Sequence, residues 1–121
     1  MIRLKRAYEA PAPEDGARYL VDRLWPRGLT KDKLRIEAWL KDLSPSPELR
    51  RWFCHDPGLW EEFKGRYQQE LAQPAQRLAL ERLARQARQG NVTLVYAAKD
   101  EQHNNALVLA QVLESLLTPR P

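Results

Sequence analysis

A run of seven residues, 92–98, is apolar on both of its alternating faces. On an extended chain successive side chains point to opposite sides, and here both sides suit burial: Val92, Leu94 and Tyr96 on one, Thr93, Val95 and Ala97 on the other. A strand buried on both faces is typical of the middle of a parallel sheet that helices cover. The run therefore predicts an α/β fold with this strand at the centre of its sheet.

Three further strands are expected before this central run. Residues 2–9 alternate apolar and charged side chains, residues 19–24 are mostly apolar, and residues 36–43 are ambiguous but alternate in the manner of a strand. Pro26 and Gly28 end the second segment, because neither supports regular strand pairing. Together these segments predict a small, mainly parallel sheet of about four strands.

Helices are expected where a capping residue and a proline precede a periodic apolar pattern. Ser46 with Pro47, and Asp56 with Pro57, are such starts, and Thr30 caps a short turn. The helix after Pro57 carries an apolar stripe made of Trp60, Phe63, Tyr67 and Leu71. Further helices are expected over residues 75–89 and 101–117, with Pro119 and Pro121 after the last. Helices that alternate with strands cover a sheet, so residues 1–121 are expected to form a single α/β domain.

The composition limits the classes of protein to which the chain can belong. Its 121 residues are 43% hydrophobic and carry a formal net charge of +4, which favours phosphate-bearing or acidic partners, although a generic soluble surface explains the charge equally well. The single cysteine, Cys54, excludes an internal disulfide. No apolar run approaches the roughly 20 residues of a membrane span, and Met1–Arg6 lacks the apolar core of a signal peptide. We therefore expect a cytoplasmic protein without a membrane partner.

The common nucleotide and redox motifs are absent from the sequence. It contains no glycine-rich phosphate loop with its lysine, no dinucleotide-binding glycine fingerprint and no pair of cysteines two residues apart. Binding of ATP or NAD in the familiar ways is not indicated, and no cofactor is expected.

A dense polar turn follows the central strand and opens the last helix. It holds Lys99, Asp100, His103, Asn104 and Asn105. Ligands of α/β sheets bind beyond the carboxyl ends of the strands, and the free N–H groups at a helix start attract anions. We expect Lys99 to bind an anion, His103 and Asp100 to handle protons, and the two asparagine amides to hydrogen-bond a base or carbonyl. The alternative is that Asp100 merely caps the helix.

A second candidate wall follows the second expected strand. Arg23 and Arg27 flank Trp25 at a tight turn. Guanidinium groups suit bidentate capture of phosphate or carboxylate, and the indole can stack on a base. We expect these three residues to bind a ligand and to face the polar turn across a cleft. The alternative places Trp25 in the core and pairs Arg23 with Asp22 or Asp42.

His55 and the pair Lys41 and Asp42 are further candidates. His55 precedes a helix and titrates near neutral pH, so it joins His103 and Asp100 as a candidate acid–base group; a loop histidine that holds backbone carbonyls is the alternative. Asp42 is a candidate base or orienting group, although a surface ion pair with Lys41 explains both residues. Two histidines so far apart in sequence are a weak signal for a metal site, and none is expected.

Five motifs are distributed between residues 21 and 106: VDRLWPRG over residues 21–28, WLKDLSPS over 39–46, FCHDP over 53–57, YAAKD over 96–100 and HNNA over 103–106. With them the sequence resembles the DUF488 family, in its short YeaO-like branch. The resemblance runs nearly from end to end and implies a single-domain bacterial or archaeal α/β protein, in a family without an assigned reaction. Cys54 departs from the family, where this position is usually glycine, which argues against a shared cysteine nucleophile.

Three classes of function remain open. The first is a small enzyme or binding domain whose anion-friendly cleft takes a nucleotide, a nucleic-acid end or a phosphorylated metabolite. The second is a non-catalytic nucleic-acid-binding or regulatory protein, because the helices within residues 46–72 resemble a helix-turn-helix and a basic row follows them: Arg77, Arg82, Arg85 and Arg88. The apolar stripe on the middle helix and ordinary solvation of the arginines argue against it. The third is a structural subunit of a larger assembly.

Overall fold

The computed structural model describes residues 1–117 and contains one four-stranded sheet in which the strands run parallel. In spatial order the strands are β1 (Ile2–Arg6), β4 (Val92–Tyr96), β2 (Ala17–Leu20) and β3 (Ala38–Trp39). β4 pairs with β1 on one side and with β2 on the other, which confirms the run that is apolar on both faces as a central strand. Pro119 and Pro121, expected after the last helix, lie outside the described residues.

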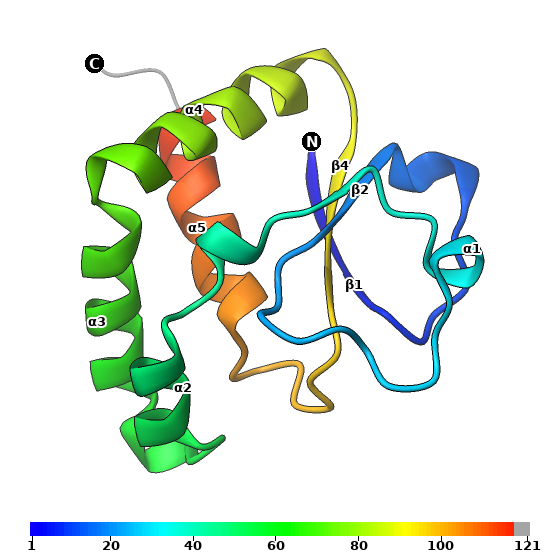
Figure 1. The fold of residues 1–121 in the computed structure, drawn as a ribbon. Helices are drawn as coiled ribbons and strands as arrows, with labels where there is room; N and C mark the ends of the chain where they lie inside the picture. Colours follow the sequence, from blue (N-terminus) through cyan, green and yellow to red (C-terminus); the bar gives the residue numbers. More distant parts are fainter. Residues whose placement is uncertain (118–121) are drawn as a thin grey trace.

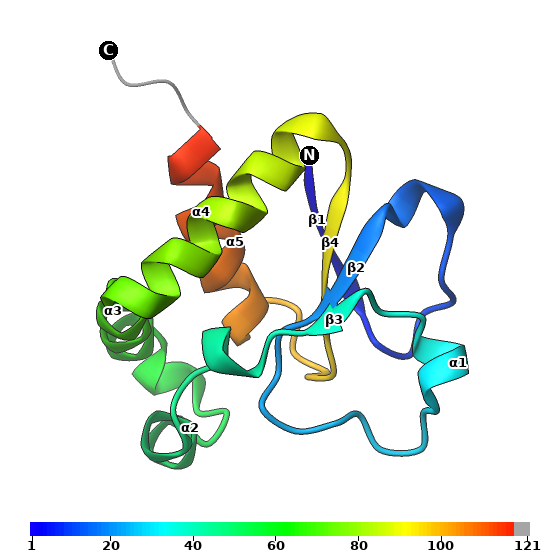
Figure 2. The ribbon, with the colours of Figure 1, turned by 45° about the horizontal axis from the view of Figure 1, so that its top comes forward.

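Helices cover both faces of the sheet unequally. The α-helices are α1 (Lys31–Leu34), α2 (Pro47–Phe53), α3 (Trp60–Leu71), α4 (Pro74–Gln89) and α5 (Asn105–Leu117), and the short 3₁₀ helices are η1 (Pro13–Asp15), η2 (Lys41–Leu43) and η3 (Pro57–Leu59). Figure 1 shows α2 to α5 on one side of the sheet and α1 on the other, and Figure 2 keeps the same division. The expected α/β architecture is therefore confirmed. Within residues 1–117, no helix is long and apolar enough to cross a membrane.

Alternating strand residues supply a core on each side of the sheet. Tyr19 and Leu94 pack under the larger group of helices, whereas Leu20 and Val95 pack on the opposite face against Leu34 of α1. Each fully buried Leu or Val side chain contributes about 1.5–3 kcal/mol of transfer free energy. All residues of β4 are buried, as expected of a strand covered on both faces.

Helix α3 is a core helix, as its apolar stripe predicts. Phe63, Tyr67 and Leu71 are buried, and the ring of Phe63 stacks on Phe53 with centroids 4.3 Å apart. The hydroxyl of Tyr67 donates a hydrogen bond to the carbonyl of Leu43. Burial raises the pKa of Tyr67, so its hydroxyl remains protonated as a donor. The apolar face of α3 is thus occupied by packing against the core.

β2 ends at Leu20, earlier than the expected boundary at Leu24. The carboxylate of Asp22 accepts a hydrogen bond from the backbone N–H of Ala97 at 2.9 Å. A side chain therefore replaces the backbone pairing that would have extended the strand. β1 and β4 also end a few residues earlier than expected.

β3 is far shorter than the expected segment of residues 36–43. Only Ala38–Trp39 pairs with β2, and Lys41–Leu43 forms the 3₁₀ helix η2. The N–H of Leu43 bonds back to the carbonyl of Leu40 at 3.0 Å, which turns the chain away from the sheet. The strand predicted from the alternating pattern is therefore confirmed for two residues and wrong for the rest of the segment.

Cys54 ends α2 in the left-handed backbone conformation, with φ of 44°. In this conformation a Cβ atom lies too close to the following carbonyl, at a cost of about 1–2 kcal/mol, whereas glycine adopts it freely. A glycine, which the family resemblance implies at this position, would adopt this conformation without strain.

Replacing Cys54 with glycine should raise the free energy of unfolding by about 0.5–1 kcal/mol, because the relief of strain exceeds the added chain entropy of glycine. Urea unfolding followed by tryptophan fluorescence measures the change. Cys54→Ala is the matched control, since it removes the thiol but keeps Cβ in the strained conformation, and it should leave stability nearly unchanged. Equal stabilisation by both variants would contradict the explanation from backbone strain.

Candidate functional site

A cleft of about 760 Å³ opens at the carboxyl ends of β2 and β4. Three segments line most of it: the chain after β2, the end of α2 with the turn that follows, and the chain between β4 and α5. Figure 1 shows the ends of β2 and β4 at the lower edge of the sheet, near α2. The bond from Ala97 to Asp22 joins the first and third segments across 75 residues of sequence.

The two walls expected from the sequence do meet across this cleft. Six of the predicted site residues line it, namely Trp25, Arg27, His55, His103, Asn104 and Asn105. Three others do not belong to its lining: Arg23, Lys99 and Asp100. The structure therefore brings six of the predicted residues to one cleft and leaves Arg23 and Lys99, the expected anion ligands, outside its lining.

Asp100 caps the polar turn and holds His103. One carboxylate oxygen accepts the backbone N–H groups of Gln102 and His103 at 2.9 and 3.1 Å, and the other contacts Nδ1 of His103 at 2.9 Å. The bonds from the Gln102 backbone and the His103 side chain hold the pKa of Asp100 below its usual range. The indole of Trp60 packs edge-on against the His103 ring, with centroids 5.3 Å apart. The expected Asp–His pair is present, and it is tied into the turn.

The two asparagines of the turn are engaged by the fold. Asn104 is buried; its Oδ1 accepts the N–H of Leu107, and its Nδ2 donates to the carbonyl of Asp100. It is the N-cap of α5, so the helix begins at Asn105 and the expected start at residue 101 is wrong. Asn105 Nδ2 donates to the carbonyl of Val21 at 3.0 Å. These amides shape the cleft wall more than they offer donors to a ligand.

The indoles after β2 and on β3 are partly structural. Trp25 Nε1 donates to the carbonyl of Leu29 and Trp39 Nε1 to that of Asp22, both at 2.6 Å. The two rings meet edge to face with centroids 5.5 Å apart. The Nζ of Lys41 lies 4.1 Å from the centroid of Trp39. Trp25 thus packs against the smaller core, on the α1 side of the sheet, and also lines the cleft. Its interpretation as a core residue and its interpretation as a ligand-binding residue are therefore compatible.

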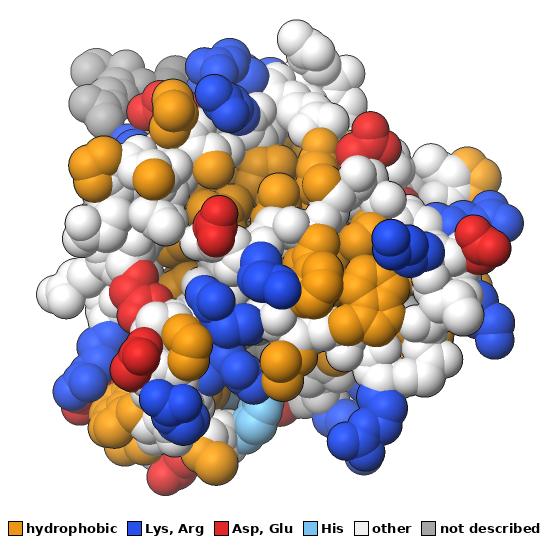
Figure 3. Space-filling view, in the orientation of Figure 1, with side chains coloured by type: hydrophobic (Ala, Val, Ile, Leu, Met, Phe, Trp, Pro, Cys, Tyr) orange, Lys and Arg blue, Asp and Glu red, His pale blue; other side chains and the backbone are white. Residues whose placement is uncertain are grey.

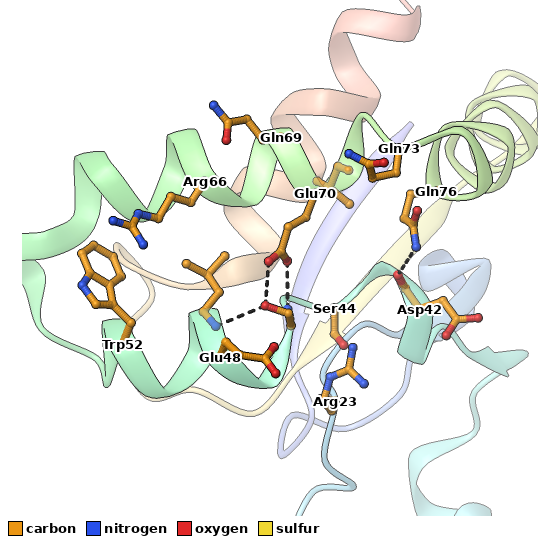
Figure 4. A pocket seen from close by; sticks show the side chains of 13 residues that line it. Arg23, Asp42, Ser44, Glu48, Trp52, Arg66, Gln69, Glu70, Gln73 and Gln76 are labelled. Carbon is orange, nitrogen blue, oxygen red and sulfur yellow. Dashed lines mark hydrogen bonds between the residues drawn. The ribbon is translucent and has the colours of Figure 1, made fainter.

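Arg23 turns into a second, more polar groove of about 610 Å³ between η2, α2 and the α3–α4 junction. Its Nε donates to the carbonyl of Pro45 at 3.2 Å. Asp42 lines the same groove, and Figure 4 shows both side chains at its edge. Lys99 is exposed on the opposite turn. Neither Arg23 nor Lys99 therefore lines the cleft that His103 lines.

Internal contacts hold much of this second groove together. Glu70 accepts hydrogen bonds from the backbone N–H and the hydroxyl of Ser46 at 2.9 and 2.6 Å, which anchors the start of α2 to α3. The guanidinium of Arg66 lies 4.4 Å from the ring centroid of Trp52 and also pairs with Glu62. The groove is mainly a seam between helices.

The lining of the first cleft has an excess of positive charge. It contains three guanidinium groups, from Arg27, Arg50 and Arg51, and one carboxyl group, that of Asp22. The three arginines are exposed, and within residues 1–117 the side chains of Arg27 and Arg51 have no hydrogen bond or ion pair. Figure 3 shows Lys and Arg side chains gathered beside a histidine over the region of α2. The rim of the cleft is thus free to bind an anion.

Asp22, Arg50 and Arg51 were missed as ligand-binding candidates. Burial raises the pKa of Asp22, although the Ala97 N–H, the Asn105 side chain and the charges of Arg50 and His55 act in the other direction. A sequence signal existed for Asp22, a carboxylate directly after a buried strand. No sequence signal marked Arg50 and Arg51, which lie in α2.

Of the two features that suggested nucleic-acid binding, the helices within residues 46–72 line the cleft and the row of arginines lies outside it. The row of arginines runs along α4, where Arg77 pairs with Glu81 and Arg88 donates to the carbonyl of Leu116.

Among residues 1–117, no group of three His, Cys, Asp or Glu side chains is placed to hold a metal ion.

Comparisons with known proteins place the chain in a family. Residues 1–120 match the family described as "Inactive DUF488-N3 subclade". The uncharacterised protein Rv3073c of Mycobacterium tuberculosis is 45% identical over 112 residues, which cover 93% of this chain and 92% of the relative. The uncharacterised protein YeaO of Escherichia coli is 44% identical over 115 residues, or 95% of this chain and 98% of the relative. No solved structure matches. The sequence motifs and these end-to-end matches agree that the chain belongs to the DUF488 family, among relatives of the YeaO type.

Proposed function

We propose that the chain binds a small phosphate-bearing ligand, such as a nucleotide or a phosphorylated metabolite, in the cleft at the ends of β2 and β4 and does not turn it over. The observation that carries this proposal is the lining with three guanidinium groups and one carboxyl group. Unpaired guanidinium groups around a concave site suit the planar, bidentate recognition of phosphate oxygens.

The position and size of the cleft support a small ligand. Small molecules bind α/β sheets beyond the carboxyl ends of the strands, in pockets of about 300–1,000 Å³. The cleft lies there, has a volume of about 760 Å³, and offers apolar surface from Leu24, Trp25 and Phe63 beside its charges. A flat or ring-shaped group can pack on this surface while the arginines hold its phosphate.

The absence of turnover rests on the state of the candidate catalytic groups. Asp100 orients His103 as a carboxylate orients a general base, but within residues 1–117 no hydroxyl or thiol is hydrogen-bonded to the imidazole. The cleft lining contains no serine or threonine, and its one thiol belongs to Cys54. Within residues 1–117 the Cys54 thiol has no hydrogen bond to His55, to His103 or to another base, so the lining holds no nucleophile that a base activates. The description of the matched subclade as inactive supports the same conclusion.

Isothermal titration of the protein with AMP and with inorganic phosphate at low salt tests the proposal. We expect both to bind, and Arg27→Ala and Arg51→Ala each to weaken binding by about tenfold, because each removes one charge-assisted contact. Arg85→Ala is the matched control, since Arg85 is an exposed arginine of α4 outside the cleft, and it should leave affinity within about twofold.

Two results would overturn the proposal. One is that the unaltered protein binds neither AMP nor phosphate. The other is that Arg85→Ala weakens binding as much as Arg51→Ala. That result would mean that the overall positive charge of the surface, and not the cleft, attracts the anion. Release of adenine or of phosphate from AMP during the titration would instead show turnover and contradict the inactive state.

A further inference from the structure

We propose that Asp22 selects among phosphorylated ligands by accepting hydrogen bonds from two adjacent donor groups at the end of the ligand opposite its phosphate. This inference rests on the proposed function. Vicinal hydroxyls of a ribose and the amino and imino edge of guanine both supply such a donor pair. Asp22 would then set the orientation of the ligand, with its donor end inward and its phosphate at the arginine rim.

The cleft carries a negative charge in its deeper part and positive charges at its exposed rim. Asp22 directly follows the fully buried Val21 and is itself half-buried, whereas Arg27, Arg50 and Arg51 are exposed. A ligand that is negative at both ends would meet the carboxylate of Asp22 with like charge. A ligand with an anion at one end and hydrogen-bond donors at the other matches both depths.

Asp22 is held rigidly from several elements. Its carboxylate accepts the Ala97 N–H at the end of β4 at 2.9 Å, and its own carbonyl accepts Nε1 of Trp39 at 2.6 Å. Asn105, at the start of α5, fixes the preceding carbonyl of Val21. A side chain whose position is set by such surrounding bonds is preorganised for recognition. A carboxylate offers about four acceptor sites, so these contacts leave capacity for a ligand.

The negative charge of Asp22 is unfavourable to the fold alone. Burial raises the pKa of its carboxyl group, and this outweighs the bonds and the positive charges of Arg50 and His55 that oppose it. An asparagine Oδ1 could accept the Ala97 N–H equally well, so the structural bond does not require a charge. Retention of a charge that opposes stability in a cleft is typical of a binding or catalytic site.

Replacing Asp22 with asparagine separates recognition from folding. The variant keeps the size of the side chain and an acceptor for Ala97, so its thermal unfolding midpoint should be equal to or above that of the unaltered protein. Its affinity for AMP should fall by about tenfold, to near that for inorganic phosphate, because a neutral amide is a weaker acceptor for hydroxyl donors. Its affinity for inorganic phosphate should not fall. Asp42→Asn, at an exposed aspartate of the other groove, is the matched control and should change neither affinity.

Ligand variation on the unaltered protein provides a second measurement that does not depend on the fold of a variant. The dideoxy analogue of AMP lacks both ribose hydroxyls, and GMP adds the amino and imino edge that AMP lacks. Weaker binding of the dideoxy analogue by about tenfold assigns Asp22 to the ribose, and tighter binding of GMP than of AMP assigns it to the base.

The outcomes distinguish this inference from the proposed function. If AMP and phosphate bind, but Asp22→Asn binds AMP within about twofold of the unaltered protein, the inference is wrong and the proposed function stands. The same holds if AMP, its dideoxy analogue and GMP bind equally. If neither AMP nor phosphate binds, the proposed function fails and the inference fails with it.

Discussion

Replacing Asp15 with asparagine should lower the free energy of unfolding by about 3–5 kcal/mol, the cost of breaking a buried ion pair by removing one partner. Asp15 is fully buried and contacts Arg18 at 2.8 Å and Lys5 at 3.1 Å. Arg18 is only 4% exposed. Its Nε is bound to the carbonyl of Leu34, and its Nη2 has no partner within residues 1–117. Without the carboxylate, the guanidinium would remain buried and uncompensated.

Urea unfolding at neutral pH measures this loss, and Glu14→Gln is the matched control. Glu14 is the neighbouring carboxylate, but its side chain is exposed, and the control should change stability by no more than about 0.5 kcal/mol. Equal effects of the two variants would show that net charge, and not the buried pair, determines the result.

The loss on replacing Asp15 should depend on pH in a defined direction. Burial alone raises the pKa of Asp15, but the hydrogen bonds from Ala12, Lys5 and Arg18 outweigh it and hold the pKa below its usual range. A lowered pKa in the folded state stabilises the fold above the unfolded value of about 3.9, and this stabilisation disappears as pH falls through the folded value. The difference in free energy of unfolding between the unaltered protein and Asp15→Asn should therefore be largest at pH 7 and become smaller below about pH 4. A constant gap would contradict the assigned pairing.

Replacing Phe63 with alanine should cost about 3–5 kcal/mol, the usual range for deleting a buried aromatic side chain. Phe63 is 2% exposed. Its ring stacks on Phe53 and on Trp60, with centroids 4.3 and 5.7 Å away, and it lies 5.7 Å from Tyr67. Alanine would leave a cavity at the centre of this aromatic cluster, which joins α2 to α3 and forms the back of the cleft.

Phe63→Leu is the control for this prediction. It retains most of the buried apolar volume, so its cost should stay nearer the limit of about 1.5 kcal/mol that holds for hydrophobic exchanges of similar volume. Urea unfolding with an unchanged slope and a lowered midpoint would identify a loss of packing energy. If both variants are equally destabilised, the ring geometry itself, and not the filled volume, is what the core requires.

Much of the fold could be predicted because local pattern and burial agree. The two-faced apolar run became the central strand β4, and the stripe of Phe63, Tyr67 and Leu71 became the core face of α3. Ser46 caps α2 through a hydrogen bond from the N–H of Leu49 at 3.1 Å, as its place before Pro47–Phe53 predicts. In these segments the apolar residues that recur in the sequence pattern are also the residues that neighbouring elements bury.

The element boundaries that the sequence misplaced were set by individual hydrogen bonds. β2 stops where Asp22 accepts the N–H of Ala97, and a pattern within residues 19–24 cannot show that partner. The start of α5 moved to Asn105 because Asp100 holds the preceding N–H groups in a turn and Asn104 supplies the cap. The sequence suggested Asp100 as the cap of this helix, and Asn104 is the residue that caps it.

The sequence by itself determined the family, the parallel α/β architecture and the meeting of two polar segments at one edge of the sheet, because strand ends follow from local periodicity and parallel strands end on the same edge. Only the tertiary structure decided which side chains face the cleft. Arg23 turns away towards Pro45, while Arg50 and Arg51 arrive from α2. Side-chain direction depends on the neighbours that each group contacts, and here those neighbours lie on other elements, beyond the reach of any local pattern.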